Sequence, residues 1–235
     1  MSASSNHHYI RCVVPLEHTE KEYTKTQMVA YKLRTVPTDV DSTTFEYKAV
    51  VFEKGKPQEY LDFHHKMERV FVGLNLTSKP IEKFAIAANL LQGEALRAFE
   101  AYVSTNAHTD AKKTDRTFKS AMEAVAKTCF PDKAVWAQKR WLNRFCKKPL
   151  GMSTRDFMNR LAQINNDLAY YPGYSTSQRY QTAELLDVAE WAVPHKWRLE
   201  MIKQDFDACA GDIPKFIAFC ERMEKVELAL SLIHI

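Results

Sequence analysis

The sequence predicts a mostly α-helical protein, with two small helical lobes preceded by a β-hairpin or two short strands. Apolar residues recur at helical spacing from Pro57 onward. Only 6 of the 235 residues are glycine, which argues against an all-β fold with many tight turns. β-Branched and aromatic residues are concentrated in two early stretches, residues 28–36 and 44–53. The chain is long enough for two lobes that each hold a small core.

Residues 1–27 are polar and without periodicity, so we predict a flexible N-terminal arm. Residues 28–54 form the predicted β-rich segment, in which "MVAYKLRTV" and "TFEYKAVVFE" flank the turn-like "PTDVDST". Within that turn, Asp41-Ser42-Thr43 resembles the D-[ST]-G loop of retroviral aspartic proteases. It lacks the glycine that this tight turn requires, so we interpret it as an ordinary loop.

Residues 55–130 make the predicted N-terminal helical lobe. Pro57 suits a first helical turn, and Ser78 is a candidate cap before a second helix that begins near Pro80. Three apolar stripes are expected to face the core: Tyr60, His64, Met67, Phe71 and Leu74; then Ile81, Phe84, Ala85, Ala88 and Leu91; then Phe118, Met122, Val125 and Cys129. Gly93 interrupts the middle of this lobe, and residues 104–115 form its clearest loop.

Residues 131–228 make the predicted C-terminal helical lobe, which begins at Pro131. One helix is expected to bury the stripe Phe157, Leu161, Ile164 and Leu168. In the last helix, we expect Phe216, Cys220 and Met223 to face inward and Glu221, Arg222 and Glu224 to face water. Residues 229–235 belong to an apolar ending, "LALSLIHI", which we interpret as a tail of non-native origin beyond which the natural protein would continue.

The overall charge and cysteine content restrict the class of protein. The net charge of +4 and the pI of about 8.7 are mildly basic, below what a dedicated nucleic-acid-binding domain carries. Five cysteines without a C-x-x-C pair indicate reduced thiols and an intracellular location, cytoplasmic or nuclear. The start of the chain has no apolar signal core, and no apolar run approaches about 20 residues, so no membrane contact is predicted.

Chemical motifs are missing from the sequence. It contains no G-x-S-x-G, no phosphate-binding loop, no H-E-x-x-H and no G-x-G-x-x-G. His64 and His65 could be metal ligands, but neighbours on a helix point about 100° apart, so a partly buried helix histidine is the simpler interpretation. Cys209 and Cys220 lack partners at zinc-ligand spacing. We therefore predict no catalytic residues, no metal, no cofactor and no small-molecule substrate.

Two sets of side chains in the second half could contact partners. A run of bases without an acid is expected on one broad helix face, where it either contacts RNA or another polyanion or forms a solvated surface: Lys139, Arg140, Arg144, Lys147 and Lys148. The four tryptophans fall on helical patterns and are either core residues or anchors of a protein interface: Trp136, Trp141, Trp191 and Trp197.

One stretch resembles a known family. Arg155-Asp156-Phe157-Met158-Asn159-Arg160-Leu161 is similar to the core of the major homology region of retroviral capsid proteins. "FEKGKPQEYLDFHHKMERV", "LLQGEALRAFEAY", "FPDKAVWAQKRWL" and "AVPHKWRLEM" resemble further parts of retrotransposon Gag in the same order. Leu150 replaces the family's glutamine and Gly151 lies closer to the helix than usual. These departures fit the Gag proteins of gypsy-type long-terminal-repeat retrotransposons, and the resemblance covers about residues 48–227.

The resemblance implies that this helix start braces the C-terminal lobe. The residues of the implied brace are Ser153, Thr154, Asp156, Phe157, Arg160 and Leu161. From the residues themselves, Ser153 or Thr154 can accept hydrogen bonds from first-turn N–H groups, and Asp156 is favourable near the positive end of a helix. Asp156 and Arg160 stand at i,i+4, a spacing at which opposite charges pair, whether as part of the brace or as a plain surface salt bridge.

The same resemblance implies a structural function. A Gag capsid protein assembles with copies of itself into a virus-like shell around the element's RNA, with RNA packaging assigned mainly to a region downstream. The alternative is a domesticated Gag-derived host protein that acts as a peptide- or protein-binding module. An enzyme or a dedicated RNA-binding protein is the third class, and a nucleotide-dependent thermal shift or a steep salt dependence of RNA affinity would identify it.

Overall fold

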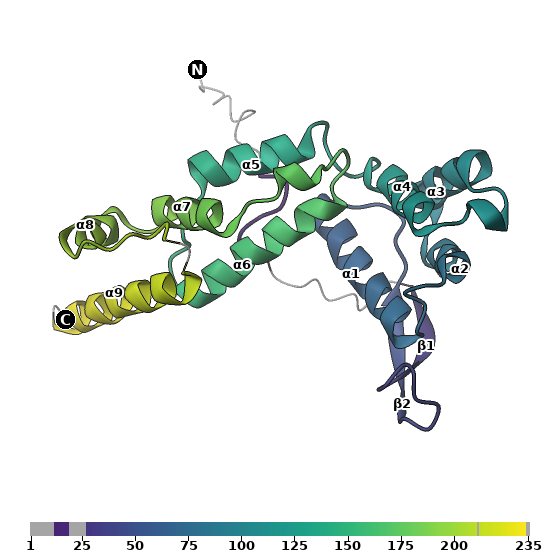
Figure 1. Cartoon of the computed structure of the whole chain (residues 1–235), viewed down its shortest axis with the longest axis horizontal. Coiled ribbons are helices and arrows are strands. Elements are labelled where there is room, and N and C mark those ends of the chain that lie inside the picture. Colours follow the sequence, from purple (N-terminus) through teal and green to yellow (C-terminus); the bar gives the residue numbers. More distant parts are fainter. Residues whose placement is uncertain (1–11, 19–26, 211, 234–235) are drawn as a thin grey trace, which may run out of the picture. The chain divides into compact units, whose positions relative to one another are not determined.

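The computed structural model describes residues 12–18, 27–210 and 212–233, with side chains described as far as Ala229. Within these ranges the chain forms nine α-helices and one two-stranded antiparallel sheet (Figure 1). The mostly helical fold with a preceding β-hairpin is therefore confirmed. In the same part of the chain, no helix is both long and apolar enough to cross a membrane.

The chain divides into two compact units, which are described one at a time. The unit called here the N-terminal unit comprises Thr19–Ala134 and Tyr170–Pro172. The C-terminal unit comprises Met1–His18, Val135–Ala169 and Gly173–Ile235. Each unit therefore contains a short segment that is distant in sequence from the rest of it.

The sheet lies at the start of the N-terminal unit. Strand β1 (Met28–Arg34) pairs antiparallel with β2 (Thr44–Val50), and Tyr31 stands opposite Tyr47. Leu33 is only 2% exposed because the end of the first helix packs on it. A Cβ atom built on Gly73 would lie 2.7 Å from a methyl carbon of Leu33, so a larger residue here would force the Leu33 side chain to move.

Four helices complete the N-terminal unit: α1 (Pro57–Gly73), α2 (Pro80–Leu90), α3 (Gly93–Asn106) and α4 (Asp115–Ala126). Their core is a chain of aromatic rings in contact. The ring centroids of Phe71 and Phe118 are 5.6 Å apart, those of Phe84 and Phe118 are 5.3 Å apart, and those of Phe84 and Phe99 are 5.8 Å apart. The predicted inward stripe of α4 is largely confirmed, with Phe118, Met122 and Val125 all buried.

Helix α2 differs from its prediction in two respects. Its N-cap is Lys79, without a side-chain hydrogen bond, and not Ser78, because Pro80 already occupies the first helical position. Its buried face is Phe84, Ala87 and Leu90, whereas Ile81 is 43% exposed. The position of Phe84 between two other rings sets the rotation of the helix, and this rotation turns Ile81 outward.

The C-terminal unit contains the remaining helices: α5 (Ala134–Phe145), α6 (Thr154–Asp167), α7 (Thr182–Ala192), α8 (His195–Lys203) and α9 (Ile213–Ile233). The predicted stripe of α6 is confirmed, because all four of its members are 0% exposed: Phe157, Leu161, Ile164 and Leu168. Helix α6 packs against α9 and α7. The backbone of α9 extends into the predicted tail at 229–235, but the side chains of 230–235 lie outside the described residues.

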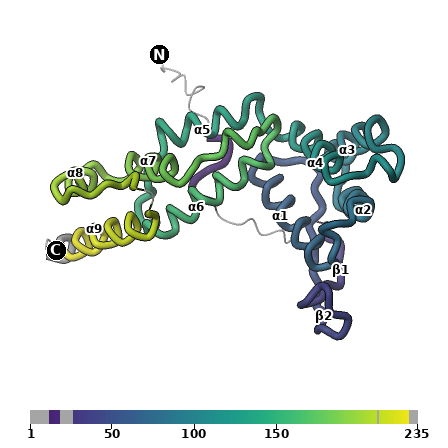
Figure 2. Tube along the Cα trace, in the orientation of Figure 1, coloured from purple at the N-terminus to yellow at the C-terminus, as the bar shows by residue number. Residues whose placement is uncertain are grey.

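Residues 12–18 belong to the C-terminal unit and run beside α5 and α6, as the purple segment in Figure 2 shows. Here the structure differs from the predicted flexible arm, since Val14 is 0% exposed and Leu16 is 5% exposed. The burial of these two apolar side chains explains why the segment is fixed. The rest of the predicted arm, apart from Gln27, lies outside the described residues.

Candidate functional site

The start of α6 is held by polar contacts of two kinds. Ser153 is the N-cap, and its hydroxyl accepts a hydrogen bond of 3.0 Å from the backbone N–H of Asp156. The Ser153 hydroxyl in turn donates to the Asp156 carboxylate over 2.7 Å. Thr154 is fully buried, and both its backbone N–H and its hydroxyl donate to Glu224 Oε1, at 2.9 and 2.7 Å. The first turn of α6 is thus capped locally and anchored to α9.

Helix α9 supplies three carboxylates at three-residue spacing. Glu221 pairs with Arg155 at 3.0 Å, and Glu224 pairs with Lys148 at 3.0 Å in addition to Thr154. Glu227 accepts from the indole N–H of the buried Trp197 and from Lys196. The prediction that Glu224 faces water is wrong, because its carboxylate satisfies a backbone N–H group at the start of α6. Glu221 stays partly exposed and pairs with the exposed Arg155.

At Glu227, burial and hydrogen bonding shift the pKa in opposite directions. Burial tends to raise the pKa, but the hydrogen bonds from Lys196 and Trp197 and the nearby Lys148 outweigh it and lower the pKa below its ordinary value. The carboxylate is therefore ionised at neutral pH. It serves as a charged hydrogen-bond acceptor between α8 and α9.

Arg160 contacts main-chain oxygens, and no ion pair with Asp156 is present among the described contacts. Its Nε donates to the carbonyl of Leu16 over 3.1 Å, and Nη2 donates to the carbonyl of Pro15 over 2.9 Å. Nη1 donates to Gln163 Oε1 over 3.0 Å. The guanidinium is buried, so it ties residues 12–16 to α6. Asp156 instead stays at the helix start with Ser153.

The basic segment does not form the single helix face that its spacing suggested. Helix α5 ends at Phe145, so Lys147 and Lys148 lie beyond it. Three lysines make contacts inside the C-terminal unit: Lys139 Nζ bonds the Gln178 carbonyl at 2.9 Å, Lys147 Nζ bonds the Trp191 carbonyl at 3.0 Å, and Lys148 pairs with Glu224. Arg144 is exposed, and the Arg140 guanidinium lies 5.0 Å from the Trp136 ring centroid.

The tryptophans divide into buried and exposed residues. Trp197 is 2% exposed and belongs to the core, and Trp141 is half-buried. Trp136 on α5 and Trp191 on α7 are 59% and 58% exposed. A guanidinium accompanies each exposed ring, since Arg198 lies 4.6 Å from the centroid of Trp191 as Arg140 does beside Trp136. Such flat surfaces of tryptophan and arginine are typical of protein interfaces.

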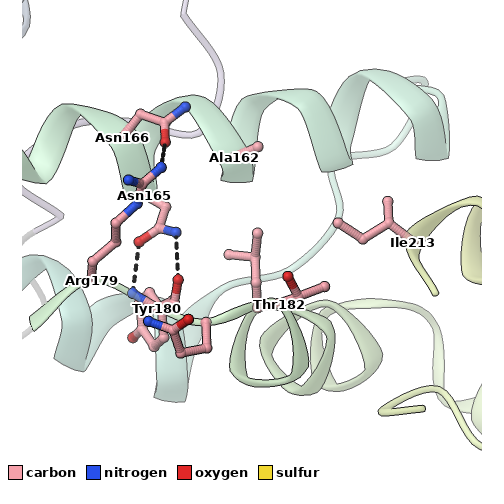
Figure 3. A pocket seen from close by; sticks show the side chains of 9 residues that line it. Ala162, Asn165, Asn166, Arg179, Tyr180, Thr182 and Ile213 are labelled. Carbon is pink, nitrogen blue, oxygen red and sulfur yellow. Dashed lines mark hydrogen bonds between the residues drawn. The ribbon is translucent and has the colours of Figure 1, made fainter. Parts of the chain in front are cut away.

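A polar cavity of about 300 Å³ lies between the C-terminal part of α6 and the start of α7. In Figure 3 the amide of Asn165 faces the main chain of Tyr180, accepting from its N–H and donating to its carbonyl, each over 2.9 Å. Arg179 donates to the side chain of Asn166 at the same edge. These polar groups bond to each other, so the cavity wall is a structural contact between α6 and α7.

Four cysteines and one histidine are buried or half-buried, and burial keeps them uncharged. Burial raises the pKa of Cys12 to about 11 and that of Cys129, Cys146 and Cys220 to about 12, so these thiols stay protonated at neutral pH. His64 is buried on α1 with its ring 4.3 Å from that of Tyr170, and burial lowers its pKa to about 3. Among the described side chains, no group of three or more His, Cys, Asp or Glu is placed to hold a metal ion.

Comparison with known proteins gave no relative. No protein-family model, no curated protein and no solved structure matches the chain.

Proposed function

We propose that this protein is a structural protein of the Gag capsid type, which assembles with copies of itself into a shell around the RNA of a retrotransposon. The observation that carries the proposal is the pair of exposed tryptophans on the C-terminal unit, Trp136 and Trp191. Exposing two indole rings to water is unfavourable in an isolated molecule, and each ring with its guanidinium is suited to burial against another protein.

The contacts of the motif-bearing helix support a structural role for it. Ser153, Thr154, Asp156 and Arg160 bond to backbone groups or to side chains of the same unit, whereas Phe157 and Leu161 are fully buried. These contacts fix the helix within its unit, and they use the polar groups for positioning. A rigid unit is what repeated weak contacts between copies require, because each copy must present the same surface.

The proposal includes a weak contact with RNA. Lys139, Lys147 and Lys148 already bond partners inside the C-terminal unit, so we place the contact on Arg140 and Arg144. Two charges give a small electrostatic term that salt screens readily. Changing both arginines to glutamine is expected to reduce RNA affinity and its salt dependence. The Lys147→Gln variant is the matched control and should leave both unchanged.

A domesticated peptide-binding module is the second candidate function. The observation in its favour is the way the C-terminal unit holds residues 12–16 by main-chain hydrogen bonds. A module of this kind would bind an extended peptide and would not need to form particles. Particle formation therefore separates the two candidates.

The test is electron microscopy of the purified protein at high concentration or high salt, together with light scattering. Wild-type protein is expected to form particles, and the double variant Trp136→Ser, Trp191→Ser is expected to lose them. Both rings are exposed, so circular dichroism should show an unchanged helix content. The matched control is Val40→Ser, which removes a 73% exposed apolar side chain from the hairpin loop of the other unit and should leave particles intact.

Two outcomes would count against the shell. One is a wild-type protein that stays a lone molecule under every condition. The other is a double variant that assembles as well as the wild type, which would show that the exposed tryptophans do not carry the contact.

A further inference from the structure

The C-terminal unit contains a site for an extended peptide segment, which the chain fills with its own residues. We name this the arm site: Gln138 on α5 and Arg160 on α6, together with the pockets taken by the side chains of Val14 and Leu16. We propose that the arm site also binds the Cys12–Leu16 segment of a second copy, so that neighbouring copies exchange arms. This inference goes beyond the proposed shell and does not depend on it.

Gln138 recognises the main chain of a single residue. Its Oε1 accepts from the N–H of Val14 over 2.8 Å, and its Nε2 donates to the carbonyl of Val14 over 3.3 Å. Gln138 is 0% exposed, so its amide has been removed from water to make these two bonds. An amide buried in this way pairs with a peptide group as a neighbouring strand does in a sheet.

Arg160 recognises the next two residues. It donates to the carbonyls of Pro15 and Leu16, while Gln163 orients the third nitrogen of the guanidinium. Pro15 is exposed and has no N–H, so its ring leaves no donor unsatisfied at this position. The buried side chains of Val14 and Leu16 add selectivity for an apolar residue at each of these two positions. The site thus contacts both the main chain and the apolar side chains of the arm.

The arm is distant in sequence from the residues that bind it. Val14 and Gln138 are 124 residues apart, and Pro15 and Arg160 are 145 apart. Residues 19–27 join the arm to β1, and a chain of nine residues can reach about 30 Å at most. The same segment in a second copy would make identical contacts, so exchange creates no new interface and loses none.

Concentration decides between the two arrangements. An arm on its own chain has an effective concentration on the order of millimolar, so a dilute wild-type protein fills its own site. A site without an arm would leave the Gln138 amide buried and without its partners, which is costly. A chain whose own arm cannot bind is therefore expected to take the arm of another copy.

The test uses two full-length variants with complementary defects. Val14→Asp prevents the arm from binding and leaves the arm site intact. Gln138→Leu removes hydrogen bonds of the arm site and leaves the arm intact. Each variant is studied alone and in an equimolar mixture by analytical ultracentrifugation, below any concentration at which the wild type forms particles. The mixture is expected to give a 1:1 complex of twice the 27.2 kDa chain mass, which neither variant gives alone.

A synthetic peptide of residues 10–18, "IRCVVPLEH", gives an independent measurement. A fluorescent form should bind the Val14→Asp protein and bind at least tenfold more weakly when Gln138→Leu is added. If circular dichroism shows that Val14→Asp is unfolded, Leu16→Asp replaces it as the arm-defective variant. The inference is overturned if the mixture gives no complex, if a complex forms equally when both chains carry Gln138→Leu, or if a scrambled peptide binds equally well.

Discussion

The core of the N-terminal unit contains a connected set of aromatic rings, whereas in the C-terminal unit several buried polar side chains bond to groups far along the chain. Phe52 and Phe63 stack at 5.2 Å, and Tyr60 meets Phe130 edge-on at 5.8 Å. The C-terminal unit instead buries Gln138 and Asn165, each of which bonds both backbone groups of one distant residue.

This difference matters because the two kinds of contact respond to different changes. Ring packing depends mainly on filled volume, so it is sensitive to the loss of atoms. A buried hydrogen bond depends on two atoms facing each other, so it is sensitive to a change of atom type at constant volume. Volume changes should therefore harm the N-terminal unit most, and isosteric polar changes should harm the C-terminal unit most.

The largest effect is expected for Phe71→Ala. This change removes a buried ring that contacts Phe118, so it should lower the free energy of unfolding by about 3–5 kcal/mol. All four tryptophans belong to the C-terminal unit, so urea unfolding followed by far-UV circular dichroism should show the loss while tryptophan fluorescence changes less. Val72→Ala, at a 57% exposed position, should change stability by less than about 0.5 kcal/mol.

A pH-dependent effect of similar size is expected at His64. Burial, with a smaller contribution from His65, lowers its pKa from 6.5 to about 3. Below pH 6.5 the unfolded chain takes up a proton that the folded unit does not accept until about pH 3. Stability should fall by about 1.4 kcal/mol per pH unit across this window, or about 3 kcal/mol at pH 4.

The check is urea unfolding of wild type and His64→Phe at pH 7 and pH 4. Carboxylates titrate in both proteins, so the difference between them isolates the histidine. The variant should lose less stability on acidification. Equal losses in the two proteins would show that His64 is protonated when folded, or that it is not buried.

A smaller loss, about 2–3 kcal/mol, is expected for Gln138→Leu. The shape is nearly kept, but the N–H and carbonyl of Val14 lose their buried partners. Tryptophan fluorescence during urea unfolding should report this loss in the C-terminal unit. Gln204→Leu, at an exposed position, is the control and should have almost no effect. Comparable losses in both would mean that the buried amide has no special role.

The smallest effect is expected for Thr154→Val. The hydroxyl bond to Glu224 disappears while the backbone bond remains, so the loss should be about 1–2 kcal/mol. Thr182→Val, at the exposed first position of α7, makes the same chemical change without a buried partner. If thermal melting shows the same shift for both variants, the contact between α6 and α9 does not stabilise the unit.

The parts of the fold that sequence predicted depend on local pattern. The hairpin and the buried stripes of α4 and α6 follow from spacing within one element. The place before an amphipathic run left Ser153 and Thr154 as candidate caps, and the structure shows that Ser153 is the cap. Helix α2 shows the limit of the method. Its rotation is set by Phe99 and Phe118, which belong to other helices, so the stripe that began with Ile81 was wrong.

The site was less predictable, since its contacts join residues far apart in the chain. The residues of the α6 start were singled out, but the carboxylate that anchors Thr154 comes from α9. The spacing of Glu221, Glu224 and Glu227 was a usable signal for one inward polar face. "CVVPL" was another, because it is an apolar run inside an otherwise polar arm. Neither pattern predicts which residues it contacts, because these contacts form only when distant parts of the chain fold together.

The distance along the chain between the arm and Gln138 has a consequence for protein synthesis. The arm leaves the ribosome 124 residues before the glutamine that binds it. At about 5–20 residues per second, the arm waits roughly 6–25 seconds without its partner. During that interval, several nascent chains on one messenger RNA lie close together. A chain further along the message completes its own site in the presence of both its own arm and the waiting arm of the chain behind it, so synthesis on one message is when the two arms compete.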